Sequence, residues 1–295
     1  MSMETERMSH YNDHSETVEI SQEDRIIGPK ISALFRNRLA RQPRWHIKKG
    51  VVTIIDTGER IAVDVSKEQI SEPLARLFTG FQMVENRLPD YMGEGNRLVR
   101  NNVGLFEVNM QWGREELNHG LALGEILVQT GYKTQKQIDE ERIQNLTKTW
   151  QLPFPSAREI VAHFVFTEIG TYLAYRALEK KAKEEGAIEI AKILNLIGDD
   201  ERYHAFGYRE ITGIYYEADP EGTIEDVLHV AENFKMPAEN LHPNQRQWAL
   251  DLARVRALSK DFVVEQILYS TLKNFGFISE ELARKTADEF FKKQK

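Results

Sequence analysis

The sequence contains no cysteine, which excludes disulfides, thiolate zinc sites and cysteine-ligated clusters. Any metal in this protein must therefore be bound by nitrogen and oxygen ligands. The chain also lacks an apolar run of about 18 residues, the length that a membrane-spanning helix needs. It has no excess of positive charge, because 39 basic and 46 acidic residues give a net charge of −7. Such a protein is not expected to bind nucleic acid in general.

The N-terminal segment lacks the features of a secretory signal. MSMETERMSHYNDHSE is polar and has no apolar core of a signal peptide. We therefore expect a cytoplasmic protein with a disordered tail at residues 1–24. A single domain is expected at residues 25–295, since a chain of 295 residues with 41% apolar residues can bury a large core.

Apolar residues recur every three or four positions over most of the chain, which predicts an all-α fold. The expected helices cover residues 66–92, 103–130, 134–149, 156–185, 187–216, 224–235, 244–275 and 279–293. The first begins at Ser66 or, because Pro73 would kink it, at Ser71. A turn is expected at DPEGT, residues 219–223. Residues 51–65 are rich in β-branched residues around an Asp-Thr-Gly sequence, which predicts a small β-hairpin.

Two of the predicted helices contain the same pair of an acid and a histidine. Glu116 and His119 lie in EELNHG, and Glu201 and His204 lie in DDERYH. Residues i and i+3 share one face of a helix, so each pair directs a carboxylate and an imidazole to one point. A third copy of the spacing, at 239–242, lies between two prolines. It is expected in a loop, where the two side chains need not share a face.

Each of the two other long helices has an acid in an apolar stretch. Glu85 follows a stripe of apolar residues, and Glu168 lies within HFVFTEIGTYLAY. A buried carboxylate without a partner is costly, and normally it pairs, takes up a proton or binds a metal. One Glu from each of two helices, with Glu-x-x-His from each of two others, is the ligand set of a four-helix di-iron bundle. Four carboxylates balance two ferrous ions, although such ligands suit manganese as well as iron.

From about residue 81 to residue 241 the chain resembles the soluble desaturases of acyl chains on acyl carrier protein (ACP), the stearoyl-ACP desaturase type. The resemblance rests on MVENRLPDY, EELNHG, FTEIGTYLAY, DDERYH, and DPEGT followed by MPA. It implies a ferritin-like helical bundle with a four-helix di-iron core, additional C-terminal helices and a homodimeric assembly. By the same resemblance, two irons are bound by Glu85, Glu116, His119, Glu168, Glu201 and His204.

The resemblance also implies roles for residues around these ligands. Glu116 and Glu201 would bridge the two irons. Thr171 would face the oxygen pocket, although a helical threonine equally often bonds back to the backbone. Asp200 and Trp45 resemble residues that connect to the histidine of the second ligand helix, and a metal-bound histidine usually has such a partner. A simple core aromatic is the alternative interpretation of Trp45.

The activity implied is that of an O2-dependent acyl-ACP desaturase, an oxidoreductase of fatty acid metabolism. Two electrons, from ferredoxin or a similar donor, and O2 would remove two hydrogens from adjacent methylenes. The products are a cis double bond and two waters. Unactivated C–H bonds resist acids, bases and nucleophiles, so the chemistry needs a metal, and the protein's part is to place the chain in an apolar channel.

ACP is acidic, so a protein with a net charge of −7 needs a local basic patch to dock it. The segment FRNRLARQPRWHIKK, residues 35–49, has basic residues and no acid. We predict docking there through Arg36, Arg38, Arg41, Arg44, Lys48 and Lys49. An ordinary solvated basic helix is the alternative interpretation of this segment.

The chain departs from the family pattern at several positions. MGEGNR follows Tyr91, where the family continues an apolar helix that lines the acyl channel. Glu94 would be costly in such a wall, so the wall must be rebuilt or opened. Leu117 and Asn118 replace the family's Asn and Arg, and the hairpin at 51–65 has no counterpart. The acyl chain length and the position of the double bond therefore stay open.

Four other functions fit part of the pattern. A ribonucleotide reductase small subunit or related oxidase has a radical tyrosine one turn after the first histidine, where this chain has Leu123. Iron-storage proteins of the ferritin type are much shorter and form cages. A di-iron oxygenase that hydroxylates or N-oxidises a small molecule could have identical ligands, and only its product differs. A metal-free helical interaction protein would bind no iron and would tolerate Glu168→Ala.

Overall fold

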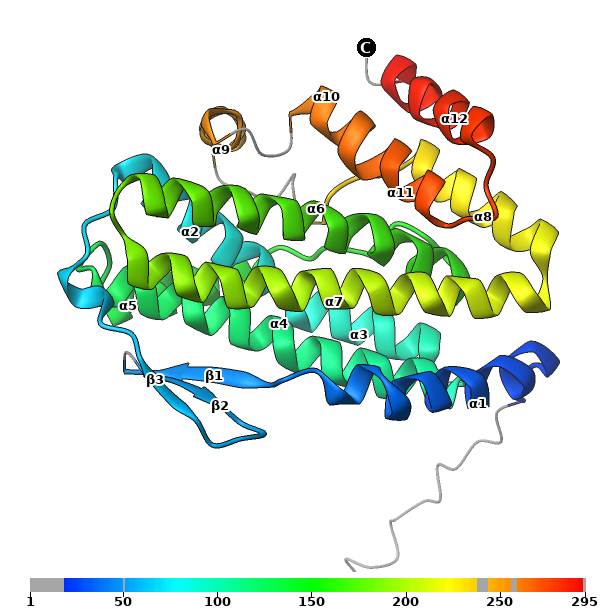
Figure 1. Cartoon of the computed structure of the whole chain (residues 1–295), viewed down its shortest axis with the longest axis horizontal. Coiled ribbons are helices and arrows are strands. Elements are labelled where there is room, and N and C mark those ends of the chain that lie inside the picture. Colours follow the sequence, from blue (N-terminus) through cyan, green and yellow to red (C-terminus); the bar gives the residue numbers. More distant parts are fainter. Residues whose placement is uncertain (1–18, 50, 238–243, 256–258, 294–295) are drawn as a thin grey trace, which may run out of the picture.

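The computed structural model describes residues 19–49, 51–237, 244–255 and 259–293. Most of these residues are helical (Figure 1), as the sequence predicts. The helices are α1 Gln22–Asn37, α2 Glu72–Glu85, α3 Leu88–Val99, α4 Val103–Gln129, α5 Gln135–Asn145, α6 Ala157–Glu184, α7 Ile188–Ala218, α8 Pro220–Glu232, α9 Gln245–Arg254, α10 Lys260–Phe262, α11 Ser270–Asn274 and α12 Glu280–Lys293. Short 3-10 helices cover Leu39–Arg41 and Val65–Lys67, and π-helix covers Val263–Tyr269.

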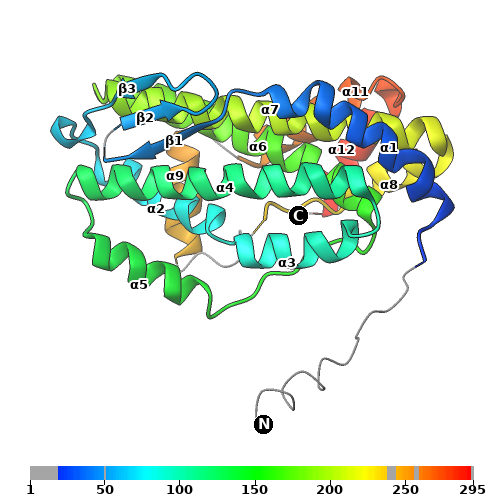
Figure 2. The same cartoon turned by 90° about the horizontal axis from the view of Figure 1, so that it is seen from below.

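The centre of the molecule is a bundle of α2, α4, α6 and α7. Helix α6 packs along α7, and α2 packs along α4. The segment α8 to α12 lies over α6, whereas α1 and the strands lie on the opposite side of the bundle (Figure 1). Figure 2 shows α4 running across the middle of the molecule between α1 and α3. The four-helix core predicted from the sequence is therefore present.

Local signals in the sequence fix where the long helices begin. Ser156 and Glu159 form a capping box at the start of α6, each side chain bonding the other's backbone N–H. Ser71, not Ser66, caps α2 by accepting from the backbone of Leu74. The predicted helix 66–92 is not continuous, because the chain leaves α2 after Glu85 and starts α3 at Leu88.

The predicted hairpin is present and is part of a larger sheet. Strands β2, Val51–Ile54, and β3, Arg60–Ala62, pair antiparallel. The turn between them contains Gly58 with a φ of 69°, a conformation that glycine adopts without strain. Strand β1, Trp45–Lys48, pairs with the other side of β2. The sequence analysis did not predict β1, and this strand places the buried Trp45 against the bundle.

Two predictions for the C-terminal third are wrong. DPEGT is not a separate turn, because Asp219 caps α8 directly and Pro220 is its first residue, a position where proline loses no hydrogen bond. Residues 244–275 do not form one helix, since α9 ends at Arg254 and the chain then passes through α10, the π-helix and α11. The third Glu-x-x-His copy, residues 239–242, lies outside the described residues.

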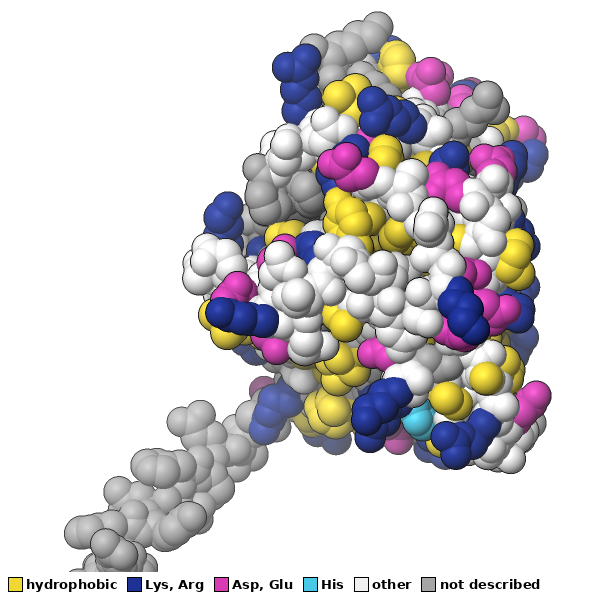
Figure 3. Space-filling view, turned by 90° about the vertical axis from the view of Figure 1, so that its left-hand side faces the viewer, with side chains coloured by type: hydrophobic (Ala, Val, Ile, Leu, Met, Phe, Trp, Pro, Cys, Tyr) yellow, Lys and Arg dark blue, Asp and Glu magenta, His cyan; other side chains and the backbone are white. Residues whose placement is uncertain are grey.

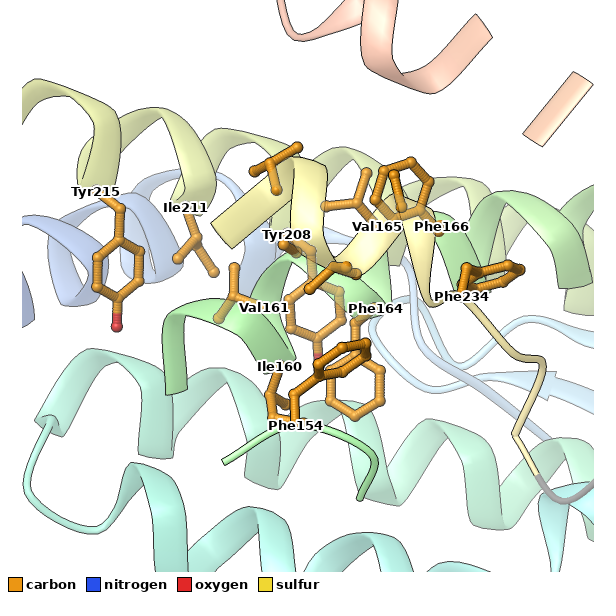
Figure 4. Close-up of a cluster of buried hydrophobic side chains, with 14 of the residues drawn as sticks. Phe154, Ile160, Val161, Phe164, Val165, Phe166, Tyr208, Ile211, Tyr215 and Phe234 are labelled. Carbon is orange, nitrogen blue, oxygen red and sulfur yellow. The ribbon is translucent and has the colours of Figure 1, made fainter. Parts of the chain in front are cut away.

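Most of the predicted N-terminal tail lies outside the described residues as well. Helix α1 begins at Gln22, within the last residues assigned to that tail. The cluster in Figure 4 fills the space beside α6 and α7 with Phe154, Phe164, Phe166, Tyr208 and Phe234 among its members. Within the ranges given above, no helix is long and apolar enough to cross a membrane.

Candidate metal centre

The six predicted ligands meet in the middle of the bundle. Glu85 is the last residue of α2, Glu116 and His119 lie on α4, and Glu168 lies on α6. The second pair, Glu201 and His204, lies on α7. All six side chains are buried, with no residue more than 7% exposed. Helices distant in the sequence thus bring four carboxylates and two imidazoles together, as the spacing predicts.

The donor atoms form two overlapping groups. The first group is Glu85, Glu116, His119 and Glu201, and the second is Glu116, Glu168, Glu201 and His204. Within each group the donor atoms lie within 4.8 Å of one another. Glu116 and Glu201 belong to both groups. This is the arrangement expected of two neighbouring metal positions bridged by two carboxylates.

Two glycines of α4 let α2 approach closely enough to deliver Glu85. A Cβ on Gly120, the last residue of EELNHG, would lie 3.2 Å from Cβ of Glu85 and 3.1 Å from the side chain of Asn86. A Cβ on Gly124 would lie 3.0 Å from the side chain of Gln82. Larger residues at these positions would push the end of α2 away. The glycine of EELNHG therefore belongs to the site as much as the acids do.

Several buried polar atoms of the cluster have no hydrogen-bond partner. They are Oε1 of Glu116, Oε1 of Glu201, and Nδ1 of both His119 and His204. Buried polar atoms are nearly always hydrogen-bonded in folded proteins. Here the partnerless atoms point to the shared centre of the two donor groups, where a cation would satisfy them. The donor set, carboxylate oxygens and imidazole nitrogens, suits iron or manganese.

The electrostatics of the cluster favour added positive charge. Burial, followed by the charges of Glu116 and Glu201, raises the pKa of Glu85 well above its usual value. Burial and the charge of Glu201 raise the pKa of Glu168 in the same way. Burial opposes the charged form of His204, but its carboxylate partners, Glu115 first, outweigh burial and raise its pKa. The raised pKa values of these carboxyl and imidazole groups mean that positive charge, from protons or from metal ions, stabilises the site.

The outer nitrogen of His119 is held as the resemblance implied. Asp200 Oδ2 lies 3.1 Å from Nε2 of His119 and accepts a hydrogen bond from Nε1 of Trp45 at 2.7 Å. Gln42 donates to Oδ1 of Asp200 at 2.5 Å. The ring of Trp45 also stacks on the His119 ring, with 6.3 Å between centroids. This chain of contacts leaves Nδ1 of His119 directed to the cluster.

The outer nitrogen of His204 has a partner that the sequence analysis missed. Glu115 Oε2 lies 2.8 Å from Nε2 of His204. Oε1 of Glu115 accepts from Gln111 at 3.0 Å and from Arg114 at 3.3 Å. Glu115 directly precedes the ligand Glu116, just as Asp200 precedes Glu201. That repeated acid before each Glu-x-x-His pair was the available signal.

Three further side chains hydrogen-bond to the predicted ligands. The Tyr175 hydroxyl donates to Oε1 of Glu85 at 2.5 Å, and Trp112 Nε1 donates to Oε1 of Glu168 at 3.2 Å. The Thr171 hydroxyl lies 3.1 Å from Oε2 of Glu201 and also within reach of the backbone oxygens of residues 167 and 168. A hydroxyl donates one hydrogen at a time. Thr171 can therefore donate either to Glu201 in the cluster or back to the backbone of its own helix.

The model of the family described as fatty acid desaturase matches residues 59–261, more than half of the chain. The chain belongs to the fatty acid desaturase family. All six predicted ligands, Thr171 and Asp200 lie within the matched residues, whereas Trp45 lies before them.

The chain is similar to curated plant desaturases of this family. Stearoyl-[acyl-carrier-protein] 9-desaturase, chloroplastic, from Olea europaea is 28% identical over 189 residues, which are 60% of this chain and 48% of the relative. The protein of the same name from Elaeis guineensis var. tenera is 31% identical over 180 residues, 56% of this chain and 44% of the relative. The chain thus spans about half the length of the curated relatives it matches.

A solved structure shares the fold of this family member. The X-ray structure of DesA2 from Mycobacterium tuberculosis H37Rv, which is assigned to the acyl-ACP desaturases, superposes with a TM-score of 0.63 at 17% identity. The match covers 90% of this chain and 99% of that chain. The likeness confirms the all-α, ferritin-like architecture predicted from the sequence.

The six predicted docking residues of this desaturase family member do not form one free patch. Arg38 pairs with Glu210 at 3.0 Å, and Arg44 pairs with Asp56 at 2.5 Å. Arg36 donates to Ser32 on its own helix. Lys48 and Lys49 are exposed, whereas the side chain of Arg41 lies outside the described part of the chain. On the end of the molecule shown in Figure 3, basic and acidic side chains are mixed. The alternative interpretation, an ordinary solvated basic helix, does not describe this segment, which passes from α1 through a 3-10 turn to β1.

Two departures from the family pattern have simple structural consequences. The Glu94 side chain is about half exposed and pairs with Arg97 at 3.1 Å, so this carboxylate is not part of a buried apolar wall. The inward side of α3 is formed by Tyr91, Gly95 and Val99. Leu123, which occupies the radical-tyrosine position of the rival oxidase, is fully buried.

Proposed function

We propose that the protein is an acyl-ACP desaturase that uses two iron ions and O2 to introduce a cis double bond into a saturated acyl chain. One observation carries the proposal. Six buried residues form two donor groups that share Glu116 and Glu201, in a chain that belongs to the fatty acid desaturase family. Two adjacent metals supply the redox chemistry that the removal of hydrogen from unactivated methylenes requires.

The chain's own residues would hold that metal pair in a fixed geometry. Glu85 and His119 would complete one metal position, and Glu168 and His204 would complete the other. Asp200 and Glu115 would orient the two histidines through their outer nitrogens, which fixes the tautomer and raises the basicity of each ligand. Tyr175 would hold Glu85 by its hydrogen bond, as Trp112 holds Glu168.

Thr171 is the residue best placed to handle a proton at the site. Its hydroxyl can donate either to Oε2 of Glu201 or to a backbone oxygen one turn back. A hydroxyl with two alternative acceptors can turn between them, and so it can pass a proton without moving the helix. The desaturation consumes two protons with its two electrons and O2, because two waters leave with four hydrogens and only two come from the acyl chain.

The apolar surroundings fit an acyl substrate. Trp112, Phe164 and Tyr208 pack ring against ring beside the second donor group, with centroids 4.9 and 5.1 Å apart. Tyr91 packs against Trp112 from α3, with 6.1 Å between centroids. These buried rings exclude water from the methylenes that would lie near the metals. We propose that the acyl chain lies along them.

The proposed partners follow from this activity. The substrate would arrive on ACP and be docked by the basic residues of segment 35–49, with Lys48 and Lys49 exposed for this contact. Reduced ferredoxin or a similar donor would supply two electrons. A second copy of the chain would complete a homodimer. We also propose that the bound metal is iron rather than manganese and that the protein is cytoplasmic.

The decisive experiment is mass spectrometry of the acyl chain after turnover. Protein loaded with ferrous iron receives reduced ferredoxin, O2 and acyl-ACPs of several chain lengths. We expect a loss of two mass units from the acyl chain, absent in Glu201→Ala. A gain of sixteen would instead establish a hydroxylase on the same bundle. An unchanged chain with two irons bound would contradict the proposed reaction.

A further inference from the structure

A narrow crevice lies where helix α1 and the turn after it pack on α4 and α7 (Figure 2). Its volume is about 30 Å³, which is room for about two molecules of the size of water. It is therefore far too small for an acyl chain. The side chains around it include Leu39 from the turn after α1, Val108 and Trp112 from α4, and His204 and Tyr208 from α7.

The crevice runs from the surface towards the metal centre. Phe35 and Tyr203, at its rim, are partly exposed, whereas Trp112 and His204 are buried. His204 belongs to the second donor group, and Trp112 donates to Glu168 of the same group. One layer of side chains therefore separates the inner end of the crevice from the second proposed metal position.

The polar side chains of the wall are engaged with other protein groups. The Gln42 amide donates to Asp200 at 2.5 Å, and the Gln111 amide donates to Glu115 at 3.0 Å. The Tyr203 hydroxyl donates to a backbone oxygen at 2.7 Å. A buried water needs about two to four polar partners. This wall therefore favours a small apolar molecule over water.

O2 is the small apolar molecule of the proposed reaction. We propose that O2 reaches the metal centre through this crevice, an inference that rests on the proposed function. The acyl chain is proposed to lie along rings that include Tyr91 and Phe164, which pack on Trp112 but do not line the crevice. A bound acyl chain would close that side of the centre to O2. An entrance between α1, α4 and α7 would stay open after the acyl chain has bound.

Gly207 of α7 helps to set the width of the crevice, which it lines. A Cβ at this position would lie 3.0 Å from Cδ2 and 3.3 Å from Cδ1 of Leu39. The Leu39 side chain would have to move, and the crevice is the space beside it. Gly213 lies on the same helix, and a Cβ there would meet nothing within 4 Å. The two glycines therefore give a matched pair of sites for the same added methyl group.

The first experiment measures where O2 resides in the metal-free protein. Dissolved O2 is paramagnetic and speeds the NMR relaxation of the methyl groups that it approaches. The reporters are Leu39 and Val108, which line the crevice and are 6% and 8% exposed. Leu252 and Val99 are the matched controls, because they are 7% and 6% exposed and do not line it. We expect a larger relaxation enhancement at both reporters, and equal enhancement within each pair would overturn the inference.

Variants that narrow the crevice give the second experiment. Val108→Phe would place a ring in the space, and Gly207→Ala would displace the Leu39 side chain into it. Each should lower the O2 enhancement at the Leu39 methyls about twofold or more, because a close-packed interior excludes even small molecules. Gly213→Ala should leave it unchanged. Gly207→Ala decides the outcome if circular dichroism shows that Val108→Phe is unfolded. Wild-type enhancement at Leu39 in folded Gly207→Ala would contradict the proposed route.

Turnover by the iron-loaded protein gives the third experiment. Gly207→Ala should raise KM for O2 about twofold or more, by the same exclusion, and should leave KM for acyl-ACP unchanged. Gly213→Ala should change neither. A rise in KM for acyl-ACP alone would mean that the crevice serves the acyl chain, and it would refute the inference. The NMR experiments need neither metal nor turnover. O2 in the crevice of a protein that leaves the acyl chain unchanged would therefore count against the proposed reaction and not against the crevice.

Discussion

The two acids that contact the histidines lead to a prediction that distinguishes the two proposed metal positions. Asp200 contacts His119, which belongs to the donor group with Glu85. Glu115 contacts His204, which belongs to the donor group with Glu168. Asp200→Ala should therefore weaken one metal position, and Glu115→Ala should weaken the other. Loss of such a partner typically lowers metal affinity about 10- to 100-fold.

The structure also gives the expected cost in stability. Asp200→Ala leaves three buried groups without their acceptor: Nε2 of Gln42, Nε1 of Trp45 and Nε2 of His119. An unsatisfied buried donor costs about 1–3 kcal/mol, so the free energy of unfolding should fall by about 3 kcal/mol or more. Asp200→Asn retains an oxygen acceptor, so its free energy of unfolding should fall by less than half as much as that of Asp200→Ala.

The assay is a titration of metal-free protein with ferrous or cobaltous ions under argon, fitted to two sites, with urea unfolding in parallel. Asp199→Ala is the matched control, since its carboxylate is half exposed and pairs with Arg202 at 3.6 Å. It should leave both affinities unchanged. If Asp200→Ala and Glu115→Ala both bind two metals with wild-type affinity, the positioning argument is wrong. If they weaken the same position, the assignment of one acid to each metal is wrong.

Three further predictions concern pH, docking and the proton at the site. Burial lowers the pKa of His163 to about 4, so unfolding takes up a proton below the unfolded value of about 6.5 and stability falls as the pH drops from 6.5 towards 4. His163→Gln should therefore lose about 2 kcal/mol less than wild type between pH 7 and 5 in urea unfolding, and equal losses would contradict this. Lys48→Glu/Lys49→Glu should raise KM for acyl-ACP about tenfold without changing iron content, whereas Lys136→Glu, on the distant and exposed start of α5, should not; an unchanged KM would exclude docking at β1. Thr171→Val should consume more O2 per double bond than wild type, and Thr171→Ser should restore the ratio; identical ratios in all three would leave Thr171 with a structural role only.

The two pairs within the candidate ligand set could be predicted because each pair depends on local helix geometry. In a helix the i,i+3 spacing fixes that Glu116 and His119 point the same way, whatever the rest of the fold does. Glu168 was recognisable because its helix offers no solvent-facing side there. The structure confirms that these side chains come together, since all of them lie in two overlapping donor groups.

Other features could not be predicted because they depend on tertiary contacts. Strand β1 is four residues long and exists through its pairing with β2, so the sequence of the basic segment around it gave no sign of a strand. The break between α2 and α3 falls where Glu85 must reach the centre, and apolar periodicity continues across it. The pairs of Arg38 with Glu210 and Arg44 with Asp56 join residues far apart in the sequence or across a turn, so the segment looked more basic than its surface is.

Helices α4 and α7 carry the same unit of an acid, a candidate ligand glutamate and a candidate ligand histidine, so the two proposed metal positions are built alike on that side. They differ in their third carboxylate. Glu168 lies in the middle of α6, where the helix continues on both sides, whereas Glu85 is the last residue of α2. Glu85 is held instead by the Tyr175 hydroxyl and by the close approach that Gly120 permits. The position of the Glu85 carboxylate therefore depends on the Tyr175 hydroxyl and on the absence of a side chain at Gly120.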